Sequence, residues 1–111
     1  MQKRSARQLI KHRSHNETEQ TWRDLVYEYV DQIPSGSICT YGEIAGYLGL
    51  TPRMVGSAMR ECPDDLPWHR VVGFGGRIAI AKRSPELAQL QLQKLKDEGL
   101  TIMNFRVVMP E

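Results

Sequence analysis

The first strong pattern in the chain is an apolar stripe with helical spacing that begins after Asn16. Asn16 with Glu19 three residues later resembles a helix-capping pair, which predicts a helix start within about one turn of this point. Pro34 must end the helix and begins a turn. We expect Trp22 and Tyr29 to lie in the core, because aromatic residues at helical spacing usually do. The apolar positions of the stripe are Trp22, Leu25, Val26, Tyr29, Val30 and Ile33.

The next segment predicts two short helices joined by a tight turn. Thr40 and Glu43 match a capping box, and Gly49 is placed to end the helix that follows it. Thr51 then supplies a second N-cap, with Pro52 at the first helical position, and this second helix cannot pass Pro63. Two short helices around a glycine-containing turn are typical of a helix-turn-helix.

The second of these helices carries small residues side by side at Gly56, Ser57 and Ala58. A glycine inside a helix costs roughly 1 kcal/mol relative to alanine, so its presence needs a reason. Arg53 and Arg60 flank the small residues, a combination that suits close approach to DNA with phosphate anchors and few base-reading side chains. Close packing against another helix would also explain the small residues, and both interpretations remain open at this stage.

The C-terminal half predicts a β-hairpin and one long helix. Two β-prone stretches, residues 66–72 and 77–80, surround a glycine-rich turn and together predict a hairpin or wing. Ser84 caps a helix that ends at Gly99, with Leu87, Leu90, Leu92 and Leu95 expected on its buried face. Residues 101–109 are expected to form a short strand or an extended tail. The predicted fold is therefore mainly α with a small β-hairpin wing, a winged helix-turn-helix.

Composition agrees with one globular domain. The chain has 111 residues, of which 41% are hydrophobic and 25% charged, and it contains no apolar run of about 18 residues. These values exclude disorder over most of the length and a membrane-spanning segment. The N-terminus has no apolar signal region, so we expect a cytoplasmic protein with Cys39 and Cys62 as free thiols. The two cysteines and three histidines match no zinc spacing, and we predict neither a metal nor a cofactor.

The net charge of +2 hides an asymmetry. Residues 1–16 carry five Lys/Arg and no Asp or Glu, whereas residues 17–111 carry ten Lys/Arg and thirteen Asp/Glu. We therefore divide the chain into a basic N-terminal arm, 1–16, and a single domain, 17–111. Such an arm is suited to polyanions because each cation placed near a phosphate releases a counterion. A solvated tail without that role is the other interpretation.

The segment Pro67–Val71 is the most specific motif in the chain. It resembles the Pro-Cys-His-Arg-Val active-site motif of the O6-alkylguanine-DNA alkyltransferases, with Trp68 in place of the nucleophilic cysteine, and in this it is similar to the alkyltransferase-like proteins. The resemblance runs from about Trp22 to Gly99 and preserves the order and spacing of the other motifs. An indole cannot accept an alkyl group as a thiolate does. The resemblance therefore implies a protein that binds alkylated DNA without repairing it.

The resemblance also implies particular site residues. It implies a lesion pocket of Tyr41, Trp68, His69, Arg83 and Glu98, and DNA contacts from Tyr41, Arg53, Gly56, Ser57, Arg60 and Arg70. Tyr41 matches the tyrosine that crowds the phosphate of the rotated nucleotide, and Arg53 matches the arginine that fills the gap left by the flipped base. Arg83 resembles the arginine that stacks on that base. His69 and Glu98 match the pair that activates the missing cysteine, and would keep only structural roles here.

The implied partner is duplex DNA containing O6-alkylguanine, bound by a monomer through the minor groove, with the lesion passed on to nucleotide excision repair proteins. Two alternatives remain. The first is a catalytic alkyltransferase that uses Cys62 or Cys39, although Cys62 has no neighbour in sequence that would lower its pKa. The second is a small winged-helix regulator that reads bases in the major groove, although Gly56, Ser57 and Ala58 offer few bidentate donors for that task.

Overall fold

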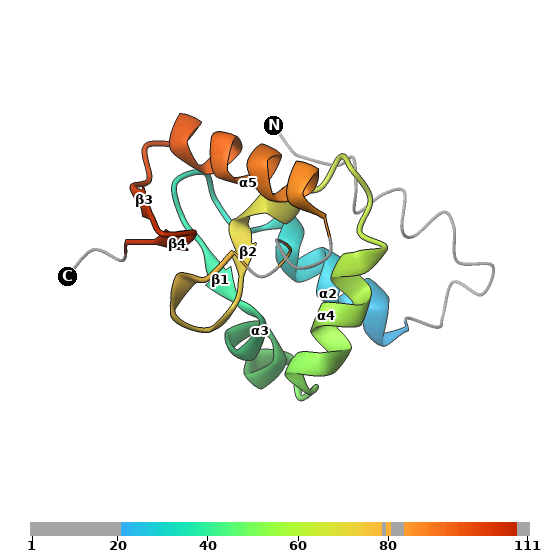
Figure 1. Ribbon diagram of the computed structural model, residues 1–111. Coiled ribbons are helices and arrows are strands. Elements are labelled where there is room, and N and C mark those ends of the chain that lie inside the picture. Colours follow the sequence, from blue (N-terminus) through green and yellow to red (C-terminus); the bar gives the residue numbers. More distant parts are fainter. Residues whose placement is uncertain (1–20, 79, 81–83, 109–111) are drawn as a thin grey trace.

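The computed structural model describes residues 21–78, 80 and 84–108. Within these residues it is mainly helical, as predicted, and it contains two small sheets. None of the described helices is long and apolar enough to cross a membrane. In chain order the elements are α2 (Trp22–Asp31), β1 (Cys39–Thr40), α3 (Tyr41–Leu48), α4 (Pro52–Arg60), the 3-10 turn η1 (Trp68–Arg70), β2 (Val71–Val72), the 3-10 turn η2 (Phe74–Gly76), α5 (Pro85–Asp97), β3 (Ile102–Met103) and β4 (Arg106–Val107) (Figure 1).

The helix ends follow the local capping signals. Both bonds of the predicted capping box are present, because Thr40 accepts from the Glu43 amide at 3.0 Å and Glu43 accepts from the Thr40 amide at 2.8 Å. Gly49 ends α3 with a φ of +75°, a left-handed conformation that favours glycine. Thr51 caps α4 as predicted. For α2 the described N-cap is Thr21, whereas Asn16 and Glu19 lie outside the described residues.

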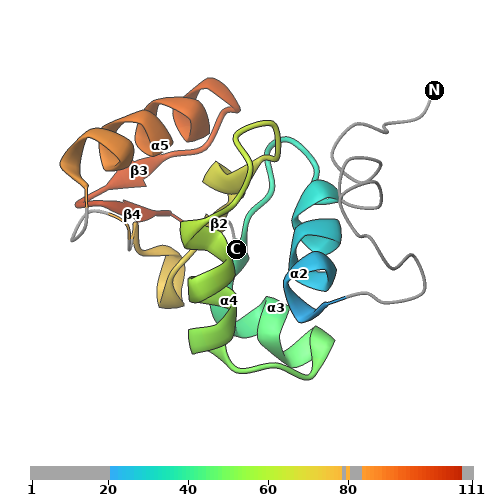
Figure 2. The same ribbon diagram turned by 90° about the vertical axis from the view of Figure 1, so that its right-hand side faces the viewer.

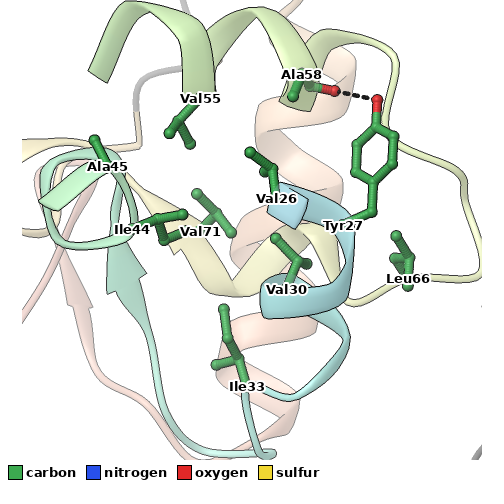
Figure 3. Close-up of a cluster of buried hydrophobic side chains, with 10 residues drawn as sticks. All are labelled: Val26, Tyr27, Val30, Ile33, Ile44, Ala45, Val55, Ala58, Leu66 and Val71. Atoms are coloured by element: carbon green, nitrogen blue, oxygen red, sulfur yellow. Dashed lines mark hydrogen bonds between the residues drawn. The ribbon is translucent and has the colours of Figure 1, made fainter. Parts of the chain in front are cut away.

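The main hydrophobic core lies between α2, α3 and α4 (Figure 3). Val26, Val30 and Ile33 are buried there, as the stripe predicted. Tyr27 was not part of the predicted stripe, yet it is buried and its hydroxyl donates a 2.8 Å hydrogen bond to the carbonyl of Ala58 on α4. The stripe widens because α2 packs against both α3 and α4, so residues on two adjacent sides become buried. The buried residues of the main hydrophobic core are Val26, Tyr27, Val30, Ile33, Ile44, Ala45, Val55, Ala58, Leu66 and Val71.

Trp22 and Tyr29, which were expected in the core, lie at its edge. Both are half-buried and pack against the main cluster from outside. The tyrosine ring also contacts the exposed Tyr47, with 5.3 Å between the ring centroids. The expectation was therefore correct about the face of α2 that carries them, and wrong about the depth of burial.

The strand pairing differs from the predicted hairpin. β2 pairs in parallel with β1, with Cys39 opposite Val71. The stretch after the glycines pairs instead with the C-terminal segment, through a bridge between Arg77 and Arg106. Gly76 explains this choice: its φ is +87°, and a Cβ there would lie 2.7 Å from the carbonyl oxygen of Val107. The glycine-rich turn thus brings the backbone against β4, and the antiparallel hairpin of the described structure is β3–β4.

A second apolar cluster lies under α5, with β2 between the two clusters. Val71 faces the main cluster and Val72 the second one, because successive side chains of a strand point to opposite faces. Figure 2 shows this division, with α5 and the β3–β4 hairpin on one side of β2 and α2 with α3 on the other. The buried members of the second cluster are Val72, Ile78, Ala88, Leu95 and Val107.

The predicted buried face of α5 is partly wrong. Leu95 is buried, but Leu87 and Leu90 are 40% and 45% exposed. The polar Gln91 takes the buried position instead, 3% exposed, and its amide donates 3.0 Å hydrogen bonds to the carbonyls of His69 and Val71. Because buried carbonyls need a partner, these two bonds fix the rotation of the helix. The rotation leaves two leucines free to line a pocket.

Candidate nucleic-acid interface

One face of α4 carries the residues predicted to meet DNA. Arg53, Gly56, Ser57 and Arg60 are spaced by three, four and seven residues from the first, so they share one side of the helix. Val55 and Ala58 lie on the opposite side, where they are fully buried. Both arginines are exposed. The helix therefore presents a smooth surface between two cations, and we call these four residues the α4 face.

The glycine of the α4 face is not required by packing inside the protein. A Cβ built at Gly56 meets nothing within 4 Å. Close packing of α4 against another described helix therefore does not explain this glycine. Of the three small residues singled out in the sequence, only Ala58 serves the protein core.

Arg23 is a candidate residue that the sequence did not reveal. It lies on α2, 34 positions before Ser57, and its guanidinium donates a 3.1 Å hydrogen bond to the Ser57 hydroxyl. The same guanidinium stacks over Trp22, 4.6 Å from the ring centroid, and lies 3.8 Å from a carboxylate oxygen of Glu61. No sequence spacing signals this contact. It places a further positive charge beside the α4 face.

Tyr41 is the first residue of α3, and Arg53 lies in the first turn of α4. Its side chain is half-buried and packs against the main cluster. Arg83, the residue predicted to stack on a flipped base, lies outside the described residues.

A pocket of about 380 Å³ lies between the end of α4, η1 and α5. Trp68, which the resemblance places in a lesion pocket, lines it together with the exposed leucines of α5. Tyr41, His69 and Glu98 are not among its lining residues, so the structure does not bring the whole predicted set together. The residues that line it are Met59, Arg60, Cys62, Asp64, Trp68, Ile80, Leu87, Leu90 and Lys94.

His69 and Glu98 lie next to this pocket within a hydrogen-bonded network. His69 Nε2 is 2.7 Å from Glu98 Oε2, and the histidine ring meets the Trp68 ring edge-on at a centroid distance of 6.2 Å. Arg70 binds the same carboxylate through Nε and NH2, and the Gly36 amide donates to it at 2.9 Å. The network ties the turn after α2, the motif and the end of α5 to one another.

The charges in this network follow from burial and hydrogen bonding. Burial would by itself raise the pKa of Glu98, but the hydrogen bonds from Arg70, Gly36 and His69 outweigh it and lower the pKa to about 2. Burial lowers the pKa of His69, and the Glu98 carboxylate does not fully compensate. At neutral pH the pair is therefore a carboxylate and a neutral imidazole whose Nε2–H donates to it.

Arg70 has a different position from the one that its predicted role requires. Its side chain is 17% exposed, and besides Glu98 it donates a 2.7 Å hydrogen bond to the carbonyl of Ile33. Because these contacts use the guanidinium inside the protein, we assign Arg70 to the internal network rather than to DNA. This corrects the assignment made from the sequence.

The two cysteines are not arranged as nucleophiles. Cys62 lines the pocket, but burial, together with the nearby Asp65 and Asp64, raises the pKa of its thiol to about 12. Burial also raises the pKa of Cys39, whose sulfur is 3.9 Å from the Tyr29 hydroxyl. Only a thiolate attacks an alkyl group readily, so neither thiol is activated. Among the described residues, no three potential metal ligands gather in one place.

Comparisons with known proteins show the family to which the chain belongs. Residues 21–100 match the family model of the 6-O-methylguanine DNA methyltransferase DNA-binding domain. Alkyltransferase-like protein 1 of Schizosaccharomyces pombe is 42% identical over 82 residues, which cover 69% of this chain and 74% of that protein. The DNA base-flipping protein of Escherichia coli is 37% identical over 90 residues, covering 78% and 67%.

A solved structure of a relative has a similar fold. The crystal structure of S. pombe Atl1 in complex with damaged DNA containing O6-carboxymethylguanine matches with a TM-score of 0.68 at 38% identity, covering 74% of this chain and 79% of that one. Fold, motif and family model together define a domain of the alkyltransferase DNA-binding class. Within that class, the chain belongs to the alkyltransferase-like proteins.

Proposed function

We propose that this protein is a non-enzymatic sensor of O6-alkylguanine in duplex DNA, which takes the lesion out of the base stack and into the pocket lined by Trp68. One observation carries the proposal: an indole forms the pocket wall, and the thiol in the same pocket, Cys62, has a pKa raised to about 12. The pocket can therefore hold an alkyl group but has no activated group to accept it. The names of the relatives, an alkyltransferase-like protein and a DNA base-flipping protein, support this function.

The α4 face supplies the approach to DNA. Gly56 has no side chain, and no described residue fills the space beside it, so the helix backbone can come close to the minor groove. Arg53 fills the gap left by the flipped nucleotide, and Arg60 contacts phosphate. A regulator that reads sequence in the major groove would need Arg, Asn or Gln donors between these two arginines, where the chain has Gly56 and Ser57.

The energetics favour a damaged base over an intact one. Flipping a base costs a few kcal/mol, and less where pairing is already weakened, as in an alkylated guanine. Stacking on an aromatic ring or a guanidinium returns roughly 1–3 kcal/mol per base. Because no covalent step traps the complex, discrimination equals the difference between the two binding free energies.

The downstream steps are also part of the proposal. A sensor without chemistry needs a repair system that removes the lesion, and we propose nucleotide excision repair, with the protein acting as a cytoplasmic monomer. The test is incision of a duplex with one O6-methylguanine by reconstituted nucleotide excision repair proteins. Addition of this protein should increase incision of that duplex and leave the incision of a duplex with a bulky adduct unchanged. Equal incision with and without the protein would contradict this step.

Lesion binding is tested with a short duplex that contains either one O6-methylguanine or guanine at the same position. Fluorescence anisotropy should give a clearly lower Kd for the modified duplex. A 2-aminopurine placed next to the lesion should become brighter on binding, because its neighbour leaves the stack. Equal affinity for the two duplexes would refute the sensor function, and tight binding without a fluorescence change would refute flipping.

A further inference from the structure

Three charged residues line the pocket, and the proposed function uses only one of them. Lys94 of α5 and Arg60 at the end of α4 are cations, and Asp64 is an acid. In the described part of the chain, the side chain of neither cation makes a hydrogen bond or an ion pair. Arg60 is exposed and lies on the α4 face, where DNA phosphates are expected to meet it. Lys94 therefore needs a separate explanation.

Lys94 is one of the residues that line the pocket. It is half-buried, and its positive charge contributes to lowering the pKa of His69, the residue that follows Trp68. Leu90 and Leu87, one and two turns before Lys94, line the same pocket. Lys94 therefore shares a pocket with two exposed leucines and the indole of Trp68.

A pocket lined by a lysine and by apolar side chains favours a lesion that carries a negative charge. A neutral alkyl group on guanine would fill the pocket and remove water from Lys94 without giving the cation a partner, which costs free energy. An alkyl group that ends in a carboxylate would fill the same space and supply the counterion. Asp64, which also lines the pocket, opposes the effect, because it already provides one negative charge.

We propose that Lys94 is a specificity-determining residue that favours O6-alkylguanines whose alkyl group carries an anionic carboxylate over neutral groups of the same size. The inference rests on the proposed function, since it concerns the same pocket. A unit charge pair near a protein surface is worth on the order of 1 kcal/mol or more, which corresponds to at least about fivefold in Kd.

The test compares two duplexes that differ only in charge at the lesion. One contains O6-carboxymethylguanine and the other O6-carbamoylmethylguanine, in which an amide replaces the carboxylate at almost the same size. The protein should bind the first about fivefold more tightly at low salt, and the preference should shrink as salt increases. Lys94→Gln should abolish the preference, and Asp64→Asn should increase it.

Lys96→Gln is the matched control. Lys96 lies in the same last turn of α5 but does not line the pocket, so both variants lose one cation at the helix end. We expect Lys96→Gln to keep the preference. A preference that is absent in the unmodified protein, unchanged in Lys94→Gln, or lost in Lys96→Gln would overturn the inference. If both lesions bind more tightly than guanine but equally to each other, the inference fails and the sensor function stands; if neither does, the sensor function itself fails.

Discussion

The carboxylate of Glu98 accepts a hydrogen bond from His69 at 2.7 Å, with the two side chains only 13% and 10% exposed. In the alkyltransferases that this chain resembles, the matching pair activates a cysteine. Here the pair stands next to an indole, and the same carboxylate also binds Arg70 and the Gly36 amide. The contacts join three distant segments, so we assign the pair to stability.

Stability should fall in acid because of Glu98. The pKa of this carboxyl is lowered to about 2 from 4.5, so its contribution is complete above about pH 4.5 and is lost as pH falls towards 2. This lowering of the Glu98 pKa corresponds to about 3 kcal/mol in the free energy of unfolding. His69 acts in the same direction. Its pKa is lower in the folded protein than in the unfolded chain, so protonation of the imidazole below about pH 6.5 favours unfolding.

Urea unfolding at a series of pH values measures this effect. Glu98→Gln should lower the free energy of unfolding at pH 7 by about 3 kcal/mol and flatten its pH dependence between 4.5 and 2. Glu86→Gln, at the exposed start of α5, is the control and should change it by less than about 0.5 kcal/mol. Matching pH profiles for the unmodified protein and Glu98→Gln would contradict the assigned role.

Gly56→Ala should affect stability and DNA binding in opposite directions. A Cβ at this position meets nothing within 4 Å, so alanine should stabilise α4 by about 0.5–1 kcal/mol. The same methyl group should weaken DNA binding if the α4 face lies against the minor groove. Gly46→Ala is the matched control, since Gly46 is also helical and also open, but lies on α3. It should stabilise the protein without changing affinity; an unchanged affinity in Gly56→Ala would argue against the proposed approach.

Arg53 should contribute to lesion binding through its shape as well as its charge. Arg53→Ala should raise the Kd for a duplex with O6-methylguanine roughly tenfold, because the gap left by the flipped base is no longer filled. Arg53→Lys keeps the charge but loses the planar group. Compared with Arg53→Ala, it should recover more of the affinity for undamaged duplex than of the preference for the lesion. Anisotropy titrations with both duplexes separate the two effects. Full lesion preference in Arg53→Ala would rule out this role.

Cys62 should be unreactive in the folded protein. With a pKa raised to about 12, only about one thiol in ten thousand is ionised at pH 8, against roughly a quarter of free cysteines. Iodoacetamide labelling, located by peptide mass, should therefore be at least about a hundredfold slower at Cys62 in the native state than in urea. Incubation with DNA containing O6-methylguanine should add no methyl group to the protein. Transfer of that group to either cysteine would establish the catalytic alternative.

Features of the fold that have a local physical cause were predictable from the sequence. The capping box of Thr40 and Glu43, the cap at Thr51 and the helix end at Gly49 involve groups within three or four residues, so the pattern alone defines them. The α4 face was also readable, because its residues follow the helical repeat. Trp68 lines a pocket, whereas its expected contact with a lesion stays a prediction.

Other features depend on contacts between distant segments. Val71 could pair with several strands, and the pairing with Cys39 was decided by packing on both faces of β2. Gln91 looks like a surface residue of a leucine-rich helix, yet two backbone carbonyls from other elements turn it inward and expose Leu87 and Leu90. Burial depth and the rotation of α5 were therefore beyond the sequence pattern.

The sequence by itself determined both ends of α3, the cap of α4, the small residues on the surface of α4 and the tryptophan within the Pro67–Val71 motif. Each of these depends on a few neighbouring residues. Only the tertiary structure decided that Arg23 reaches Ser57, that Arg70 binds Glu98 inside the protein, and that Lys94 stands at the pocket wall. These relationships join residues 26 to 34 positions apart along the chain, from Trp68 and Lys94 to Arg23 and Ser57. Such residues meet only when helices pack and bury their apolar faces.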